Sequence, residues 1–257
     1  MKVYFIGAGP GASDLITIRG ADILARVPVV LYAGSLVPPA ILTHCRLDAE
    51  IINSAELTLD QQIEHYQKAR SIGYDVARVH SGDPSIYGAT AEQMRGLKQL
   101  GIDYEVVPGV SSFTAAAACI RTELTKPEVS QTIILTRTEG RASAVPIEES
   151  IGELASHGAT MSIFLSGQYL KETVAELLEY YPEDTPAALV YRATWPDERT
   201  HVSTLGGLLQ EINPADWKLT TVLLVGQALS NDTGSDSRLY AADYSHKFRN
   251  IHTSGET

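Results

Sequence analysis

The chain has 257 residues and a net charge of −11, and 44% of its residues are hydrophobic. That hydrophobic share suits a packed core and excludes a wholly disordered chain, while the length allows one large or two modest domains. The acidic balance argues against a nucleic-acid partner, because binding to phosphates needs a basic face. The longest nearly apolar runs, such as Thr221–Leu229, are far short of the ~20 residues that cross a bilayer.

Cysteine and histidine usage predicts neither a disulfide framework nor a structural metal. Cys45 and Cys119 are the only cysteines, and no two of the seven histidines have the i,i+4 spacing of paired helical ligands. The N-terminus shows no cleavable signal pattern. We therefore expect a cytoplasmic protein with a small-molecule partner, without a metal, a membrane or a nucleic acid.

The first half of the chain alternates short apolar runs with segments of helical period. Strands are predicted at Lys2–Ile6, Pro28–Tyr32, Glu50–Asn53, Asp75–His80 and Tyr104–Val107. Helices are predicted at Asp14–Arg26, Leu59–Ile72 and Ala89–Leu100. Such alternation predicts an α/β domain whose mostly parallel sheet is covered by helices on both faces.

The second half repeats this alternation after a polar, proline-bearing stretch, Thr125–Ser130. Strands are predicted at Gln131–Thr136, Ala159–Leu165, Ala187–Tyr191 and Thr221–Gly226, and helices at Ile147–His157, Lys171–Tyr181 and Ser203–Ile212. We expect two α/β domains, residues 1–124 and 125–230, followed by a polar tail, residues 231–257.

A glycine-rich turn, Gly7–Gly11 (GAGPG), directly follows the first predicted strand. It is similar to a dinucleotide-binding fingerprint, in which glycines let backbone amides approach a pyrophosphate. However, Pro10 removes one donor, Ala12 stands where a third glycine is usual, and no acidic residue ends the second strand. A phosphate loop and a tight turn without phosphate both remain open on these residues.

Two further turns follow predicted strands, at the sheet edge where parallel α/β proteins bind ligands. His80–Gly88 (HSGDPSIYG) has two glycines that permit close backbone approach and an Asp-Pro turn that exposes a carboxylate. Val106–Ser112 (VVPGVSS) brings Ser111 and Ser112 to the start of an alanine-rich helix. Each turn fits either a ligand contact or a helix cap.

Arginines follow two strands of the second half, in Thr136–Arg141 and Tyr191–Pro196. Arg137, Arg141 and Arg192 are suited to bidentate hydrogen bonds with carboxylates, although a solvated arginine is the ordinary alternative for each. No Ser-His-Asp order and no catalytic carboxylate pair follows from the spacing.

Together, GAGPG, SGDPSIYG, VPGVSS and the second α/β half resemble the tetrapyrrole methyltransferase family over residues 1 to about 230. The segments Glu123–Arg137 and Tyr191–Glu198 are similar to those members that methylate carbon 11 of precorrin-4 or of its cobalt form. The resemblance implies S-adenosylmethionine as methyl donor, bound with a tetrapyrrole in a cleft between the two domains. It also implies a homodimer, which the long apolar stretch Val29–Leu42 independently suggests. In this family the glycine-rich turn is not a dinucleotide site.

The resemblance further implies a set of site residues. The cofactor contacts fall on Gly82, Asp83, Ile86, Ser111, Ser112, Leu165, Arg192, Ala193 and Gly226. Pro10, Arg137 and Arg141 fall near the substrate. No catalytic residue is implied with certainty, and Tyr87 and His80 are the candidates because both flank the Gly-Asp-Pro turn and exchange protons.

Three alternatives stay open: methylation of another corrin or uroporphyrinogen carbon, a nicotinamide oxidoreductase that uses Gly7–Gly11, and a nucleotide-sensing regulatory module. The tail, with Ser237–Tyr240 and Phe248–Arg249, is more similar to the cobalt-free pathway than to the cobalt one.

Overall fold

The computed structural model describes residues 1–139, 144–165, 169–217 and 219–230, and residues 237, 239, 241, 244–245 and 247–249 of the C-terminal segment. It divides into two compact units. The first unit contains Met1–Cys119 together with Val190–Thr200, and the second contains Ile120–Leu189 together with His201–Thr257. The expected tail lies largely outside the described residues.

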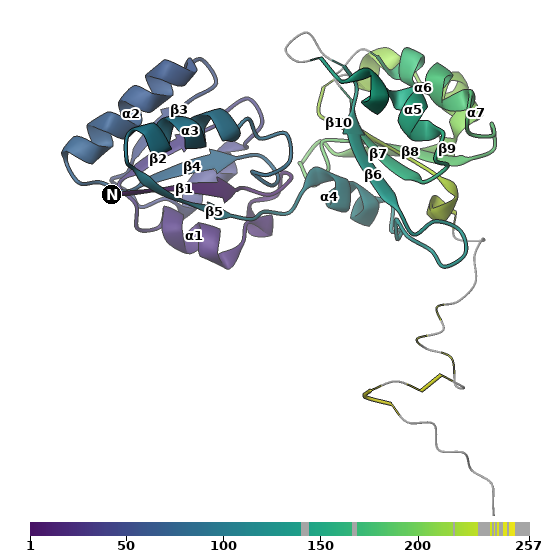
Figure 1. Ribbon diagram of the computed structural model, residues 1–257, viewed down its shortest axis with the longest axis horizontal. Coiled ribbons are helices and arrows are strands. Elements are labelled where there is room, and N and C mark those ends of the chain that lie inside the picture. Colours follow the sequence, from purple (N-terminus) through teal and green to yellow (C-terminus); the bar gives the residue numbers. More distant parts are fainter. Residues whose placement is uncertain are drawn as a thin grey trace, which may run out of the picture. The chain divides into compact units, whose positions relative to one another are not determined.

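The first unit is built on a five-stranded sheet with the order β3-β2-β4-β1-β5 and parallel pairing throughout (Figure 1). Its strands are β1 (Lys2–Gly7), β2 (Val29–Tyr32), β3 (Glu50–Asn53), β4 (Val76–His80) and β5 (Asp103–Val107). Its helices are α1 (Ile18–Leu24), α2 (Leu59–Ser71), α3 (Ala91–Gln99) and α4 (Ser112–Cys119).

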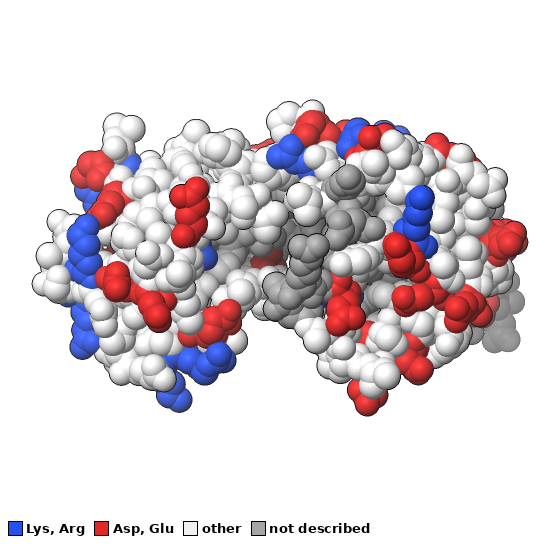
Figure 2. All heavy atoms as spheres, turned by 90° about the horizontal axis from the view of Figure 1, so that it is seen from above, with Lys and Arg blue, Asp and Glu red and all other residues white. Residues whose placement is uncertain are grey.

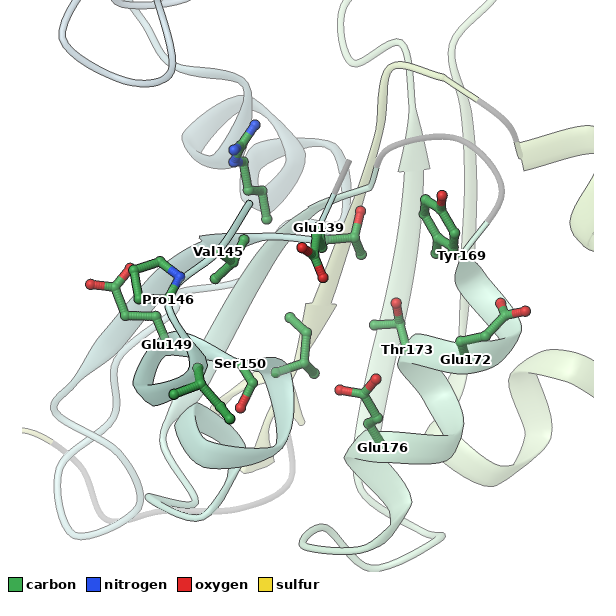
Figure 3. Close-up of a pocket in the computed structure, with 13 residues that line it drawn as sticks. Glu139, Val145, Pro146, Glu149, Ser150, Tyr169, Glu172, Thr173 and Glu176 are labelled. Atoms are coloured by element: carbon green, nitrogen blue, oxygen red, sulfur yellow. The ribbon is translucent and has the colours of Figure 1, made fainter. Parts of the chain in front are cut away.

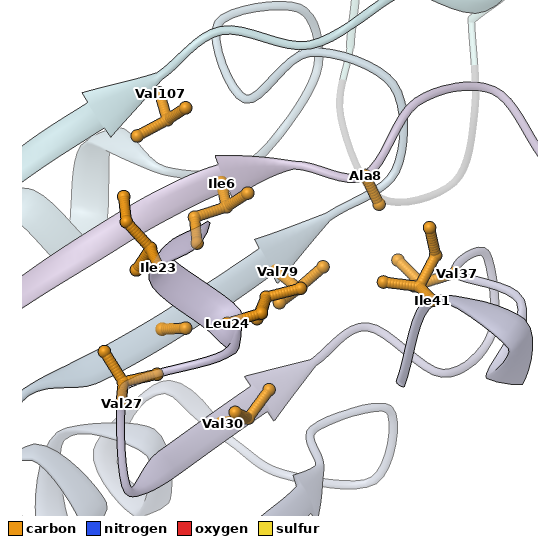
Figure 4. Packing of buried hydrophobic residues seen from close by; sticks show 11 residues of the cluster. Ile6, Ala8, Ile23, Leu24, Val27, Val30, Val37, Ile41, Val79 and Val107 are labelled. Atoms are coloured by element: carbon orange, nitrogen blue, oxygen red, sulfur yellow. The ribbon is translucent and has the colours of Figure 1, made fainter. Parts of the chain in front are cut away.

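Both faces of this sheet are covered, and every residue of its central strand β4 is buried. On one face, Ile23 and Leu24 of α1 pack against Ile6, Val30 and Val79 (Figure 4). On the other face, α2 and α3 contribute a second cluster. Its buried members are Val3, Phe5, Val29, Leu31, Tyr66, Ala69, Val76, Leu97 and Ile102.

The helix starts follow from local capping. At α2, the Thr58 hydroxyl accepts the backbone N–H of Gln61, whose side chain accepts the N–H of Thr58, a reciprocal capping box. At α1, the expected helix from Asp14 begins only at Ile18, because the Thr17 hydroxyl caps Gly20 N–H. The residues before this cap form a short 3₁₀ helix, Ser13–Leu15.

The second unit holds a five-stranded sheet with the order β6-β7-β10-β8-β9. Its strands are β6 (Ile133–Arg137), β7 (Thr160–Leu165), β8 (Pro186–Tyr191), β9 (Arg199–Thr204) and β10 (Thr221–Val225). Its helices are α5 (Ile151–Ala155), α6 (Leu170–Leu178) and α7 (Leu205–Glu211). β6 and β7 are parallel, whereas β7 and β10 are antiparallel. The expected α/β class with two mostly parallel sheets is confirmed.

Two features of the chain differ from the sequence-based expectation. β9 was not anticipated, and residues 190–200 group with the first unit although they were expected in the second domain. In addition, the apolar stretch Val29–Leu42 is not an exposed patch, since Val37 and Ile41 are buried in the core of the first unit. The dimer prediction therefore cannot rest on this stretch as a whole being exposed.

The face drawn in Figure 2 shows how charge is spread over the described surface. Asp and Glu side chains lie over both units, with basic side chains interspersed among them. This distribution on the face drawn is typical of an acidic chain. No helix in the described part of the chain is long and apolar enough to cross a membrane.

Candidate active site

Three loops of the first unit meet at the carboxyl edge of its sheet, because β1 lies between β4 and β5. The loop after β1 and the loop after β4 pair through their backbones: Gly82 N–H donates to the Gly9 carbonyl at 2.8 Å, and Gly9 N–H donates to the Gly82 carbonyl at 3.3 Å. Ala8 N–H also donates to the His80 carbonyl at 2.8 Å. The glycine-rich turn is thus locked to its neighbour.

Glycines allow the three loops to approach one another this closely. A Cβ on Gly109 would lie 2.1 Å from the Gly82 carbonyl oxygen, and a Cβ on Gly7 would lie 2.6 Å from Gly109 Cα. No side chain fits at either position, because real Cβ atoms keep well beyond those distances. Gly7 and Gly109 therefore serve backbone packing between loops, which explains the GAGPG turn without a phosphate.

Asp83 ties the loop after β4 to the loop after β5. Its Oδ2 accepts the Gly109 N–H at 2.9 Å, and its Oδ1 accepts both the N–H and the hydroxyl of Ser85. Partial burial acts to raise the pKa of this carboxyl, but the hydrogen bonds from Ser85 and Gly109 outweigh it, so the pKa is lowered. Asp83 was expected to contact the cofactor, but both its carboxylate oxygens already accept hydrogen bonds within the protein.

Ser111 and Ser112 lie where α4 begins. Ser111 is buried and Ser112 is half-buried, and neither hydroxyl is hydrogen bonded to another residue in the described part of the chain. The Ser111 carbonyl accepts the Ala115 N–H, as the first turn of the helix requires. The two hydroxyls and the first N–H groups of α4 thus remain available at this edge.

Residues 192–198 lie against the glycine-rich turn within the first unit. Trp195 Nε1 donates to the Pro10 carbonyl at 2.8 Å, and the Thr194 hydroxyl accepts the Ala12 N–H at 2.9 Å. A Cβ on Gly11 would lie 2.3 Å from the Trp195 ring. Pro10 itself is buried. In this structure it contacts Trp195 and is not exposed for contact with a substrate.

Arg192 is held beside this contact. Its Nη1 donates to Asp197 at 2.6 Å, and its guanidinium stacks 4.0 Å from the centre of the Trp195 ring. The neighbouring Ala193 is buried. Arg192 and Thr194 adopt left-handed backbone conformations, with φ of 49° and 68°. This strained segment lies within Tyr191–Glu198, which the sequence singled out, but the contacts of Thr194 and Trp195 with the glycine-rich turn were not expected.

The two acid–base candidates lie in contrasting environments. Tyr87 is 54% exposed, whereas His80 is 4% exposed. Burial, aided by the nearby Arg78 charge, lowers the pKa of His80 to about 3. A ring that stays neutral and enclosed suits a structural hydrogen bond better than proton exchange. Ile86, between the two, is half-buried.

The remaining expected residues belong to the second unit. Arg137 pairs with Phe164 where β6 and β7 end, so Arg137 and Leu165 share one edge of that sheet. Gly226, in contrast, follows Val225, which pairs with Met161 near the start of β7. The structure therefore does not bring Gly226 and Leu165 together. Arg141 lies outside the described residues.

A cavity of about 620 Å³ opens beside α5 and α6 in the second unit (Figure 3). Its wall carries Arg137 and four carboxylates, Glu139, Glu149, Glu172 and Glu176, with Tyr169 at one side. Such acidic surroundings oppose the expected role of Arg137 in gripping substrate carboxylates. No group of His, Cys, Asp and Glu side chains among the described residues could hold a metal ion.

Comparison with known proteins shows the family. The model of the tetrapyrrole (corrin/porphyrin) methylases matches residues 2–209, and the chain belongs to that family. It is therefore a methyltransferase, built here from two compact α/β units.

Individual relatives cover almost the whole chain. It is 49% identical to precorrin-4 C(11)-methyltransferase of Pseudomonas aeruginosa, over 97% of this chain and 99% of that one. It is 44% identical to cobalt-precorrin-4 C(11)-methyltransferase of Methanocaldococcus jannaschii, over 98% and 97%. Among solved structures, a cobalt-precorrin-4 methyltransferase of cobalamin biosynthesis superposes with a TM-score of 0.85 at 42% identity, covering 89% of this chain and 96% of that one.

A more distant structure shares the fold. Uroporphyrin-III C-methyltransferase of Thermus thermophilus, complexed with S-adenosylhomocysteine, superposes with a TM-score of 0.71 at 23% identity, covering 89% of this chain and 99% of that one.

Proposed function

We propose that this chain transfers a methyl group from S-adenosylmethionine to carbon 11 of precorrin-4. The observation that carries the proposal is sequence identity of 45–49% over nearly the full length to proteins named precorrin-4 C(11)-methyltransferase. The cobalt-free substrate is favoured by the higher identity to the Pseudomonas aeruginosa relative. The cobalt form is the second candidate, since a relative that acts on it is 44% identical along its length.

The residues at the carboxyl edge of the first sheet fit a sulfonium cofactor. We assign the donor to the backbone of Gly82 and Ile86, the hydroxyls of Ser111 and Ser112, and the buried Ala193. The donor supplies an electrophilic methyl group, so no metal or covalent enzyme intermediate is needed. Asp83 shapes this site by joining two of its loops. Leu165 and Gly226 are left out of this assignment, because they lie in the second unit at opposite ends of β7.

The protein's contribution to the reaction is binding, orientation and exclusion of water. Holding a donor and an electron-rich ring carbon in line supplies a large part of a rate acceleration through proximity. A general base is not required for attack by the ring carbon. Tyr87 remains a candidate for accepting a proton later, because it is the exposed titratable side chain of the turn.

The reaction is tested by incubating the purified chain with S-adenosylmethionine and, in separate samples, precorrin-4 and cobalt-precorrin-4. We expect a product one methyl group heavier from precorrin-4, with an isotopically labelled methyl located on carbon 11 by NMR. Faster turnover of the cobalt form would establish the second candidate. Methylation at another ring carbon, or none with either substrate, would refute the assignment of carbon 11.

A further inference from the structure

The central strand β4 buries two polar side chains that the proposed reaction does not use. Arg78 is 5% exposed and pairs between Phe5 on β1 and Leu31 on β2, both fully buried. No carboxylate in the described part of the chain forms an ion pair with Arg78. A guanidinium in such a place costs free energy relative to an apolar side chain, so its presence calls for a role other than core stability.

Arg78 and Tyr66 orient the side chain of Gln93. Arg78 Nε and the Tyr66 hydroxyl each donate to Gln93 Oε1 at 3.0 Å. Burial raises the pKa of Tyr66 to about 12, so its hydroxyl keeps the proton that it donates. With two donors on the oxygen, the amide nitrogen of Gln93 points the other way and donates to the Ala89 carbonyl at 2.9 Å.

His80 makes the neighbouring contact. Its ring is hydrogen bonded to the Gly88 backbone, and its Nε2 has no partner among the described residues, so Nδ1 is the bonded atom. This hydrogen bond acts to raise the pKa of His80, so the ring is its donor and the Gly88 carbonyl is its acceptor. Two consecutive carbonyls, those of Gly88 and Ala89, are thus held from the side of the sheet that α2 and α3 cover.

The turn that these bonds hold is strained. Tyr87 and Ala89 both adopt left-handed conformations, with φ of 51° and 48°, which are unfavourable for residues with a side chain. Between them, a Cβ on Gly88 would lie 2.3 Å from the Pro84 carbonyl oxygen. The Thr90 hydroxyl donates to that same carbonyl at 3.2 Å. Backbone strain of this kind persists only where surrounding contacts impose it.

We propose that Arg78, Tyr66, Gln93 and His80 form a buried polar network that positions the turn 84–90, and through it the donor-binding loop after β4. The second part of this inference rests on the proposed function, since it takes Gly82 and Ile86 to contact the donor. These four are positioning residues, because their hydrogen bonds reach the turn and not a reacting atom.

Gln93→Glu separates this role from general stability. A carboxylate at this position still accepts from Arg78 and Tyr66, but it cannot donate to the Ala89 carbonyl. Leu97→Val is the matched control: Leu97 is buried on the same helix and face, and the lost methylene lowers core stability without touching the turn.

The first readout is amide hydrogen exchange of the ligand-free protein. We expect exchange in residues 84–90 to rise at least tenfold in Gln93→Glu relative to β4 and to the rest of α3, and Leu97→Val to show no such local increase. Unchanged exchange of the turn in Gln93→Glu, or equal loss of protection in both variants, overturns the network.

The second readout is calorimetric affinity for S-adenosylhomocysteine. We expect Gln93→Glu to weaken binding at least fivefold and Leu97→Val to leave it within twofold. An opened turn with unchanged affinity overturns the link to the donor-binding loop while the network itself stands. Absence of binding by the unaltered protein refutes the proposed donor, and the exchange result still decides the network.

Discussion

At the scale of single residues, the site is defined by which polar atoms already have hydrogen-bond partners within the protein. Asp83 has the exposure of a ligand-binding carboxylate, yet both its oxygens accept hydrogen bonds from Ser85 and Gly109. Ser111 and Ser112 show the reverse, with hydroxyls that no described residue engages. Residues that hold the loops in place and residues that face a ligand are therefore different sets.

Asp83→Asn is expected to weaken both the fold of the loops and donor binding. An amide offers one acceptor oxygen where the carboxylate offers two, so one of the donors from Ser85 or Gly109 loses its partner, at a cost of about 1–3 kcal/mol. Chemical denaturation and calorimetry with S-adenosylhomocysteine measure the two effects. Ser85→Ala, which removes a single bond, is the control and should cost less. Equal affinities for all three proteins would contradict this role of Asp83.

The same carboxyl predicts a pH dependence. Because the folded pKa of Asp83 is lowered from 3.8, its contribution to stability is complete above that value and is lost as the pH falls through the folded pKa. Asp83→Asn should therefore lose less stability than the unaltered protein on acidification below pH 3.8.

At the scale of elements, glycines decide how closely the three loops approach one another. Gly109→Ala places a Cβ against the Gly82 carbonyl and Gly7 Cα, so we expect the loops to separate and the affinity for S-adenosylhomocysteine to fall at least tenfold. Overpacking of this kind costs about 1–3 kcal/mol.

Gly73→Ala is the control for Gly109→Ala. Gly73 has a φ of 73° and open space around it, so the substitution costs about 1–2 kcal/mol of backbone strain but should leave affinity unchanged. If both variants bind equally well, the close approach of the loops is not what shapes the site.

At the scale of the whole molecule, we predict a homodimer in solution. Most of the stretch Val29–Leu42 cannot be the reason, since its Val37 and Ile41 are internal. Leu36 of that stretch, and Leu47 and Ile51 further along the chain, are exposed, and exposed apolar side chains are typical of interfaces. Sedimentation equilibrium at micromolar concentration should give twice the chain mass of 27.8 kDa.

Leu47→Lys tests where the dimer interface lies. It should shift the sedimentation equilibrium towards the monomer, whereas Ile18→Lys, at another highly exposed position, on α1, should not. A monomeric unaltered protein would contradict the dimer prediction itself.

The sequence by itself determined the α/β class, most strands and helices, the loops at the carboxyl edge of the first sheet, and the family. These features rest on local signals: apolar periodicity, and Gly and Pro turns that a single segment contains. Helix ends were less well predicted, as at α1 and α5, because a cap depends on one side-chain hydrogen bond.

Only the tertiary structure decided what the motif residues do. Trp195 reaches Pro10 across 185 positions of sequence, and no local pattern announces that contact. The GAGPG glycines are explained by close packing of three loops, Asp83 by bonds to two of them, and His80 by burial that keeps its ring neutral. Each of these roles depends on distances between segments remote in the chain, which composition and spacing do not contain.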